Sequence, residues 1–377
     1  MKMKKTVKSI AVAIAAVVSG VVVSCSGGGG SAAGDFAEAE DLRADSIAIN
    51  EIIQPNNILL RDGYAVISSP KNKKVLFRYS LPGWEITDTS LTRGEGPGDL
   101  NDAVLLKQNR KDDTLWISEP NKRMLLKAVM NPGGISVEEE IRLQGYDLWL
   151  WNSAFVVDGK SIVNIKLDFW DTEETKVYSY DMTDSMAVRD SVLCLTRAYI
   201  EKHDDGKSKW ASATISNSPE IQIVGDRMAI WYPDTRNTMI YRIGADGRFV
   251  PEKTFGEPLT YEQVKNMDFK NIKRDEAENF VSADEDYLYF KYVKTKKVED
   301  NTEDNAGGPS GNAPKPEKRE NVALELRVYD WDMNPVKKFT LDKVNGTSLF
   351  IDRANGKIYS YDRSLDFEYV YVYDFKI

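Results

Sequence analysis

The chain has 377 residues, of which 29% are charged and 10% are aromatic, and its formal net charge is −9. It contains a single histidine and two cysteines. An acidic chain with no basic patch is a poor partner for nucleic acid, and one histidine is too few for the usual zinc or catalytic metal sites.

The first residues predict an export signal. MKMKKTVK carries four lysines and no acidic residue, and residues 9–23 form an uncharged, mostly apolar run. A basic start followed by such a run is typical of a signal peptide. The run is shorter than the roughly 20 residues that a membrane-spanning helix needs. We therefore expect residues 1–24 to be a signal peptide that is removed after export.

The signal peptide ends in Val22, Val23, Ser24 and Cys25. Small or aliphatic residues directly before a cysteine resemble the bacterial lipobox, in which the cysteine thiol receives a diacylglycerol, and this predicts lipidation of Cys25. The alternative is an ordinary signal peptide that happens to contain a cysteine. The next residues, SGGGGSAAG, have too few side chains to bury, so residues 25–44 are expected to be a flexible tether. Acyl chains on Cys25 would anchor the protein to a membrane.

From residue 45 to residue 377 the chain consists of short alternating segments rich in Val, Ile, Tyr, Phe and Trp, separated by Gly, Asp, Asn and Pro, which is typical of strands and turns. The segments form similar groups of four, such as NILLRDG, YAVISSP, KVLFRYS and WEITDTSL. The third segment of most groups carries a matching tyrosine: Tyr79, Tyr180, Tyr241, Tyr329 and Tyr373. This repeat predicts an all-β, six-bladed β-propeller of four-stranded antiparallel blades. A barrel or a pair of sandwiches is the structural alternative.

Three segments qualify this pattern. The last group stops one strand short, and SIAINEII at residues 46–53 is unused, so we expect this N-terminal strand to complete the last blade and remove an exposed edge. Thr260 and Gln263 stand in a capping-box relation that predicts a short helix. Residues 294–320 are charged and rich in Gly, Pro and Asn, which predicts a disordered insert within the fifth blade.

The glycine-rich stretch LTRGEGPGDL could be taken for a phosphate loop. Such a loop needs consecutive backbone N–H donors and often a Lys followed by Ser or Thr, whereas here a proline removes a donor and two acidic residues would repel an anion. We interpret the stretch as a blade-joining turn in which glycines permit positive φ angles. The turn consists of Gly94, Glu95, Gly96, Pro97, Gly98 and Asp99.

Aromatic residues are the best sequence candidates for ligand binding. In YDLWLWN, Trp149 and Trp151 are two apart and share one side of an extended chain, with Tyr146 near;. These rings are expected near the axial channel, where they could stack on a sugar or a peptide. Trp170, in a loop of the third blade, could contribute from the opposite or outer face. The alternative is that all four rings wedge between blades as core.

Two residues suggest chemistry but are better explained by structure. His203 lies beside Asp204 and Asp205, yet no second histidine or free thiol pair is present to complete a metal site, so we interpret it as an exposed loop residue. The aspartate clusters of the chain lack the spacing of a calcium loop. Cys194, in DSVLCLT, is expected to be a small buried hydrophobe. With Cys25 lipidated it has no disulfide partner.

The turn at residues 94–99, the lipobox and the six-unit propeller together resemble the TolB-like six-bladed β-propeller lipoproteins of the Bacteroidota, over essentially the whole mature chain. The resemblance implies a propeller fold and a location in the cell envelope, lipid-anchored to the outer membrane. The family has no agreed catalytic residues, so none is carried over. Surface display is associated with acidic residues after the lipidated cysteine, whereas Ser26 and four glycines follow here. The periplasmic and surface faces therefore both stay open.

Two functions are consistent with these observations. The first is a non-enzymatic binding or scaffolding module for an envelope protein, peptide or glycan, monomeric and without a cofactor. The second is a propeller hydrolase or lyase with an acidic, metal-assisted site in the axial channel. The sequence favours the first, because it lacks the histidines and thiols that nucleophilic or metal chemistry uses. No catalytic residue and no metal ligand is assigned.

Overall fold

The computed structural model describes the part of the chain within the compact unit Ala32–Ile377. The described residues are 35–96, 98–109, 112–143, 154–167, 174–204, 209–269, 275–298, 319–346, 348–362 and 368–377, with the backbone alone for 203–204 and 209–213. None of the helices among these residues has the length and hydropathy of a membrane span.

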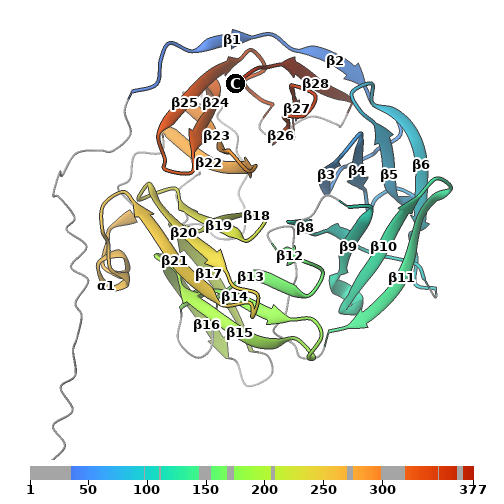
Figure 1. The fold of residues 1–377 in the computed structure, drawn as a ribbon, viewed down its shortest axis with the longest axis horizontal. Helices are drawn as coiled ribbons and strands as arrows, with labels where there is room; N and C mark the ends of the chain where they lie inside the picture. The colour runs from blue at the N-terminus through green and yellow to red at the C-terminus, as the bar shows by residue number, and fades with distance from the viewer. Residues whose placement is uncertain are drawn as a thin grey trace, which may run out of the picture. The chain divides into compact units, whose positions relative to one another are not determined.

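Six small antiparallel sheets stand in a ring around an axis, so the predicted six-bladed propeller is confirmed (Figure 1). The first blade contains β3 (Asn57–Arg61), β4 (Tyr64–Ser68), β5 (Lys74–Ser80) and β6 (Glu85–Thr92). The second contains β7 (Val104–Leu105), β9 (Thr114–Glu119), β10 (Met124–Asn131) and β11 (Gly134–Arg142). The third contains β12 (Phe155–Val157), β13 (Ser161–Leu167), β14 (Thr175–Asp181) and β15 (Ala187–Leu193).

The second half of the ring repeats this plan. The fourth blade contains β18 (Glu220–Val224), β19 (Arg227–Tyr232), β20 (Asn237–Ile243) and β21 (Phe249–Phe255). The fifth contains β22 (Glu276–Ala283), β23 (Tyr287–Lys297), β24 (Arg319–Asp330) and β25 (Pro335–Leu341). The sixth contains β26 (Ser348–Asp352), β27 (Lys357–Tyr361), β28 (Tyr369–Asp374) and β2 (Asp45–Ala48).

The hydrophobic core is divided among the junctions between blades. Buried side chains of the described residues form six clusters, and each cluster joins two neighbouring blades. At the junction of the sixth and first blades, for example, the ring of Trp84 packs edge-on against Tyr359 with the centroids 5.2 Å apart. Since each blade buries both faces, apolar burial at about 25 cal/mol per Å² stabilises the whole ring.

The repeated tyrosine marks a β-bulge. The register of the third and fourth strands shifts directly before Tyr79, Tyr180, Tyr241 and Tyr329. A bulge bends the strand and re-aims the side chain that follows. All four tyrosines lie in or against the apolar clusters between blades. In the second blade the same shift precedes Ala128 instead.

The N-terminal strand closes the ring as predicted. β2 pairs antiparallel with β28, with Ser46 opposite Tyr371 and Ile47 opposite Val370. The strand is shorter than residues 46–53, because Ile49 and Ile52 turn into the core between the first and sixth blades, where they are 1% and 4% exposed. Closure thus removes the outer edge of β28 from solvent.

The tether predicted over residues 25–44 ends earlier than expected. β1 (Glu40–Leu42) adds to the fifth blade in parallel with β25. Leu42 enters the core between the fifth and sixth blades, and the ring of Phe36 packs edge-on against Tyr329 with the centroids 5.0 Å apart. The expectation missed β1 because Leu42 is a single apolar residue in a charged stretch. Cys25 and the glycines lie outside the described residues.

Two further segments differ from the structure expected from the sequence. β23 and β24 extend past the blade and pair as far as Lys297 opposite Arg319. The predicted insert at 294–320 therefore has strand at both margins, and residues 299–318 lie outside the described part. β16 (Arg197–Asp204) and β17 (Lys209–Ser216) pair antiparallel outside the six blades. His203 pairs with Trp210 in its register, so the expectation of a loop histidine was wrong.

The predicted helix is confirmed as α1 (Tyr261–Lys265). The Thr260 hydroxyl accepts from the backbone N–H of Gln263 at 3.3 Å, and the Gln263 side chain accepts from the N–H of Thr260 at 2.8 Å. This capping box satisfies two donors that a helix start leaves open. Val264 then reaches the core between the third and fourth blades.

Candidate functional site

An axial channel is lined by the innermost strands of the blades. Two cavities of about 230 and 510 Å³ occupy it. We call the smaller one the C-end chamber, because it lies at the carboxyl ends of the inner strands and is lined by Arg61, Gln108, Ser282, Asp284, Asp352 and Arg353. The larger one, the N-end chamber, is lined by Asn57, Glu220, Asn279, Lys291 and Ser348.

The two chambers adjoin at an apolar collar. Both are lined by Ile58, Leu59, Val281, Leu349 and Phe350. Lys107 and Gln222 also line both chambers, and they are the polar members of this shared ring. Small-molecule sites are typically apolar cavities of about 300–1,000 Å³ with a few convergent polar groups. The larger chamber falls within this range of volumes, with the collar as its apolar surface and Lys107 and Gln222 among its polar groups.

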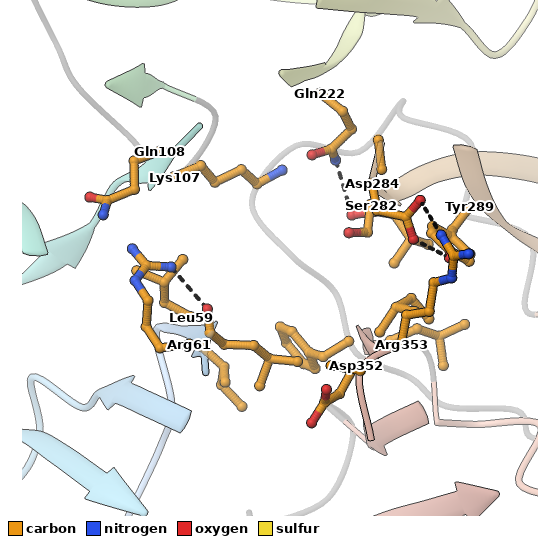
Figure 2. Close-up of a pocket in the computed structure, with 18 of the residues that line it drawn as sticks. Leu59, Arg61, Lys107, Gln108, Gln222, Ser282, Asp284, Tyr289, Asp352 and Arg353 are labelled. Atoms are coloured by element: carbon orange, nitrogen blue, oxygen red, sulfur yellow. Dashed lines mark hydrogen bonds and ion pairs between the residues drawn. The ribbon is translucent and has the colours of Figure 1, made fainter. Parts of the chain in front are cut away.

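Lys107 reaches the channel because the chain passes here from pairing with the second blade to pairing with the third. β7 pairs with β9 of the second blade, but β8 (Lys107–Gln108) pairs in parallel with β12 of the third blade. The N–H of Leu106 still donates to Trp116 at 2.8 Å, and that of Lys107 already donates to Ala154 at 3.2 Å. This switch turns the Lys107 side chain into the channel (Figure 2).

Lys107 is a cation without a hydrogen-bonding counterion in the described part of the chain. Its ammonium lies 5.2 Å from the centroid of the Phe155 ring. Desolvation by the surrounding protein lowers the pKa of Lys107 to about 8, although the charge of Glu220 opposes the shift;. An anion in the channel would therefore find a poorly compensated positive charge.

Arg61 brings a second cation to the wall of the C-end chamber, at the end of β3 (Figure 2). Its side chain is 7% exposed, and Nη1 donates to the carbonyl oxygen of Leu60 at 2.9 Å. Nε and Nη2 are covered by protein and have no hydrogen-bond partner among the described residues. Burial lowers the pKa of Arg61 to about 10 against the attraction of Asp112 and Asp62.

Gln108 adds another unsatisfied group beside these cations. Its Nε2 donates to the carbonyl oxygen of Thr114 at 2.7 Å. Its Oε1 is buried and lacks a donor within the described ranges. Buried polar atoms are nearly always hydrogen-bonded, so unsatisfied ones that gather around one cavity call for an explanation.

The opposite wall of the C-end chamber is fully paired. Nη1 of Arg353 donates to Asp284 at 3.0 Å and to Asp286 at 2.7 Å. The Tyr289 hydroxyl donates to the other oxygen of Asp284. The Asp352 carboxylate accepts from the backbone and the side chain of Asn355, at 3.2 and 2.8 Å. The negative charges of this wall therefore have hydrogen-bond partners, while Lys107 and Arg61 face them without an ion pair among the described residues.

The polar groups of the N-end chamber connect neighbouring blades. The Glu220 carboxylate accepts from Asn279 at 2.8 Å and from the N–H of Phe280 in the next blade. Asn57 accepts from the N–H of Leu105 at 3.2 Å and from the Ser68 hydroxyl at 2.7 Å. Burial raises the pKa of Glu220. These contacts align adjacent inner strands.

The ligand platform predicted from aromatic residues cannot be compared with this channel, because its residues lie outside the described ranges. They are Tyr146, Trp149, Trp151 and Trp170. The channel residues escaped the sequence analysis, since a charged residue at the end of an alternating segment looks like a solvent-exposed one. The available signal was Lys107 and Gln108, which directly follow the apolar run AVLL.

The turn at residues 94–99 runs between β6 and β7, and Pro97 lies outside the described residues. Only Gly98 has a positive φ, of 77°. Gly94 and Gly96 are constrained by space instead, because a Cβ there would lie 2.5 and 2.9 Å from the Asp99 carboxylate. That carboxylate accepts from the N–H of Gly96 at 3.2 Å. The expectation of positive φ at all three glycines was therefore wrong for two.

Cys194 is fully buried, as expected, in the core between the third and fourth blades. Desolvation raises the pKa of its thiol to about 12, which leaves it protonated and unreactive;. Among the residues that the structure describes, no group of three or more His, Cys, Asp or Glu side chains is arranged to hold a metal ion.

Comparison with known proteins finds similarity at the level of structure alone. No family model and no curated protein matches the chain. An exported protein of Bacteroides fragilis has a similar structure, with a TM-score of 0.51, 12% identity and coverage of 89% of this chain and 96% of that one. A member of the DUF4221 family from Bacteroides vulgatus gives a TM-score of 0.46 and 10% identity over 88% and 98% of the two chains. At 12% identity, the likeness to the B. fragilis protein shows the fold alone.

Proposed function

We propose that this protein is an exported envelope lipoprotein, anchored to the outer membrane through Cys25, whose propeller binds a ligand in the axial channel without transforming it. The leader and the lipobox-like residues support the anchor. The description of the B. fragilis neighbour as an exported protein agrees with this location.

One observation carries the binding proposal: Lys107 projects into the channel with no hydrogen-bonding counterion among the described residues. A half-buried cation without a counterion carries a desolvation cost, and structural cations normally find acceptors, as Arg353 does;. Such a group is expected where a ligand supplies the missing acceptor. The neighbouring carboxylates Asp284 and Asp352 are engaged in hydrogen bonds, which suits recognition better than proton transfer.

Ligand binding in the channel is tested with the full chain in detergent. Thermal-shift screening with small glycans, peptides and organic acids is expected to raise the melting temperature for at least one class, because a ligand that binds only the native state stabilises it. Leu59→Trp fills the collar and Ser282→Phe narrows the C-end chamber; both should abolish the shift.

The control for those variants is Val250→Trp, at a position 51% exposed in β21 on the outer strand of a blade. It should respond like the wild type. Equal shifts in melting temperature in the wild type and all three variants would place binding outside the channel and contradict the proposal. Lipidation is tested separately, by incorporation of labelled palmitate that is lost in Cys25→Ala.

A further inference from the structure

The chemistry of the channel also indicates which ligand it takes, an inference that rests on the proposed function. We propose that the channel binds a monocarboxylate with a small apolar body, whose carboxylate contacts the Lys107 ammonium beside Arg61 and whose body lies against the collar.

Lys107 is the contact point because its ammonium reaches the space shared by both chambers. An ammonium offers three donors. None of them meets an acceptor among the described residues, and the Phe155 ring 5.2 Å away compensates the charge only weakly;. A carboxylate oxygen would form a charge-assisted hydrogen bond there, which is stronger than a neutral one.

Arg61 acts through its charge. Its Nε and Nη2 atoms are covered by protein. The guanidinium therefore makes the chamber more positive without touching the ligand. In a low-dielectric cavity such a charge is felt over several ångströms. Asp62 and Asp112 influence the Arg61 charge but accept no hydrogen bond from it within the described part of the chain.

The charges of the remaining wall limit the ligand to one negative charge. Asp62 and Asp352 line the C-end chamber, and Glu220 lines the N-end chamber. A dianion such as phosphate would place its second charge near these carboxylates, and like charges at short range repel. One carboxylate, by contrast, matches the single ammonium of Lys107.

The apolar body of the ligand follows from what surrounds Lys107. Leu59, Val281 and Phe350 of the collar line both chambers next to it. A neutral, extensively hydroxylated sugar would leave polar groups facing these side chains, at the desolvation cost of unpaired polar groups. An aliphatic or aromatic acid would bury its body there and gain hydrophobic free energy.

The decisive experiment measures Kd by calorimetry on the full chain in detergent at pH 7, with benzoate and hexanoate against the neutral benzamide and hexanamide. The acids are expected to bind at least about tenfold more tightly, since a hydrogen bond to a charged group contributes about one factor of ten or more. Lys107→Met should remove this preference, and Lys107→Arg should keep it. Arg61→Met should weaken acid binding about threefold, a smaller loss because it removes a charge only.

The matched control is Lys253→Met, because Lys253 lies on the outer strand β21 and pairs with Asp332. It should bind the acids like the wild type. Melting temperatures of all variants establish that they fold.

The affinity for the acids should also depend on whether Lys107 is protonated. The charged groups that line the chambers around this side chain come from several inner elements: Arg61 and Asp62 at the end of β3, Glu220 in β18, Asp284 directly after β22, Lys291 in β23, and Asp352 and Arg353 at the end of β26. The Lys107 ammonium is lost as the pH rises through about 8, so acid affinity is expected to fall between pH 7 and 9 in the wild type and to stay level in Lys107→Met.

The outcomes separate this inference from the proposed function. Equal affinities for acids and amides, abolished by Leu59→Trp, would overturn the carboxylate and leave channel binding intact. Tighter binding of inorganic phosphate than of benzoate would also overturn it. Binding of neither acid nor amide at millimolar concentration would overturn the inference, and the wider ligand screen would then decide the proposed function.

Discussion

The two chambers of the channel differ in how they treat buried polar groups. In the N-end chamber, Glu220 and Asn57 each hydrogen-bond to a neighbouring blade. In the C-end chamber, Nε and Nη2 of Arg61 and Oε1 of Gln108 lack partners within the described residues. Both ends of the same strands are built from similar residue types. The N-end groups are thus satisfied by contacts between blades, whereas these C-end groups have no hydrogen-bond partner in the described part of the chain.

This contrast predicts opposite responses to mutation. Removing a hydrogen-bonded group leaves its partners without hydrogen bonds and destabilises the fold. Removing a buried group that has no partner relieves a desolvation cost and stabilises the fold. Function and stability should therefore separate along the axis of the channel.

The largest effect is expected for Glu220→Ala. It leaves the N–H of Phe280 and the Asn279 amide without their acceptor and removes the negative charge that opposes the lowering of the Lys107 pKa. We expect a loss of about 3 kcal/mol in the free energy of unfolding, measured by urea denaturation. Glu220→Gln, which keeps an acceptor oxygen, should lose about half as much. An unchanged urea midpoint in Glu220→Ala would show that the N-end contacts do not align the blades.

Asn57→Ala should follow with a loss of about 2 kcal/mol, because it removes contacts to both the N–H and the carbonyl oxygen of Leu105;. Asn57→Asp keeps the acceptor and loses the donor, so it should be intermediate. The same urea experiment measures both. If Asn57→Ala were as stable as the wild type, the Asn57 contacts would not stabilise the junction of the first and second blades.

The lowered pKa of Lys107 predicts that the free energy of unfolding depends on pH. Its pKa is about 8 in the native chain and 10.5 in the unfolded one, so between these values the unfolded chain binds more protons and stability rises with pH. The wild type should gain about 1.5 kcal/mol relative to Lys107→Met between pH 7.5 and 9.5. The window ends near pH 10, where tyrosines such as Tyr79, whose pKa is raised by burial, begin to favour the unfolded state. Parallel curves for the two proteins would contradict a desolvated Lys107.

The smallest expected effect is an increase in the free energy of unfolding, opposite to the losses expected for Glu220→Ala and Asn57→Ala. Arg61→Met should raise the free energy of unfolding by about 1 kcal/mol at pH 7, because it removes an unsatisfied buried guanidinium and leaves an apolar side chain of similar length. The matched comparison is Arg353→Met, which breaks the pairs with Asp284 and Asp286 and should destabilise. Destabilisation by both changes would mean that Arg61 is structural.

Much of the fold was predictable because blades are built from local patterns. The alternating segment KVLFRYS matches β5 to the residue, and the tyrosine repeat marked the third strand of each blade concerned. The capping box of Thr260 and the unused strand at residue 46 were also local signals. Each depends on residues within a few positions of one another.

What escaped prediction depends on contacts between distant segments. β1 pairs with β25 about three hundred positions away, and its own sequence contains one apolar residue. The antiparallel pair of β16 and β17 carries charged residues that obscure its alternation. The change of partner at Leu106 depends on the position of the third blade, which no residue near Leu106 encodes.

By itself, the sequence determined the all-β character, the number of blades, the closing strand and the expectation of a lipid anchor, because side-chain alternation and terminal motifs act over short stretches. Only the tertiary structure decided the candidate site. Arg61 and Lys107 stand in different blades, and they face one cavity because ring closure brings the inner strands of all the blades around a single axis.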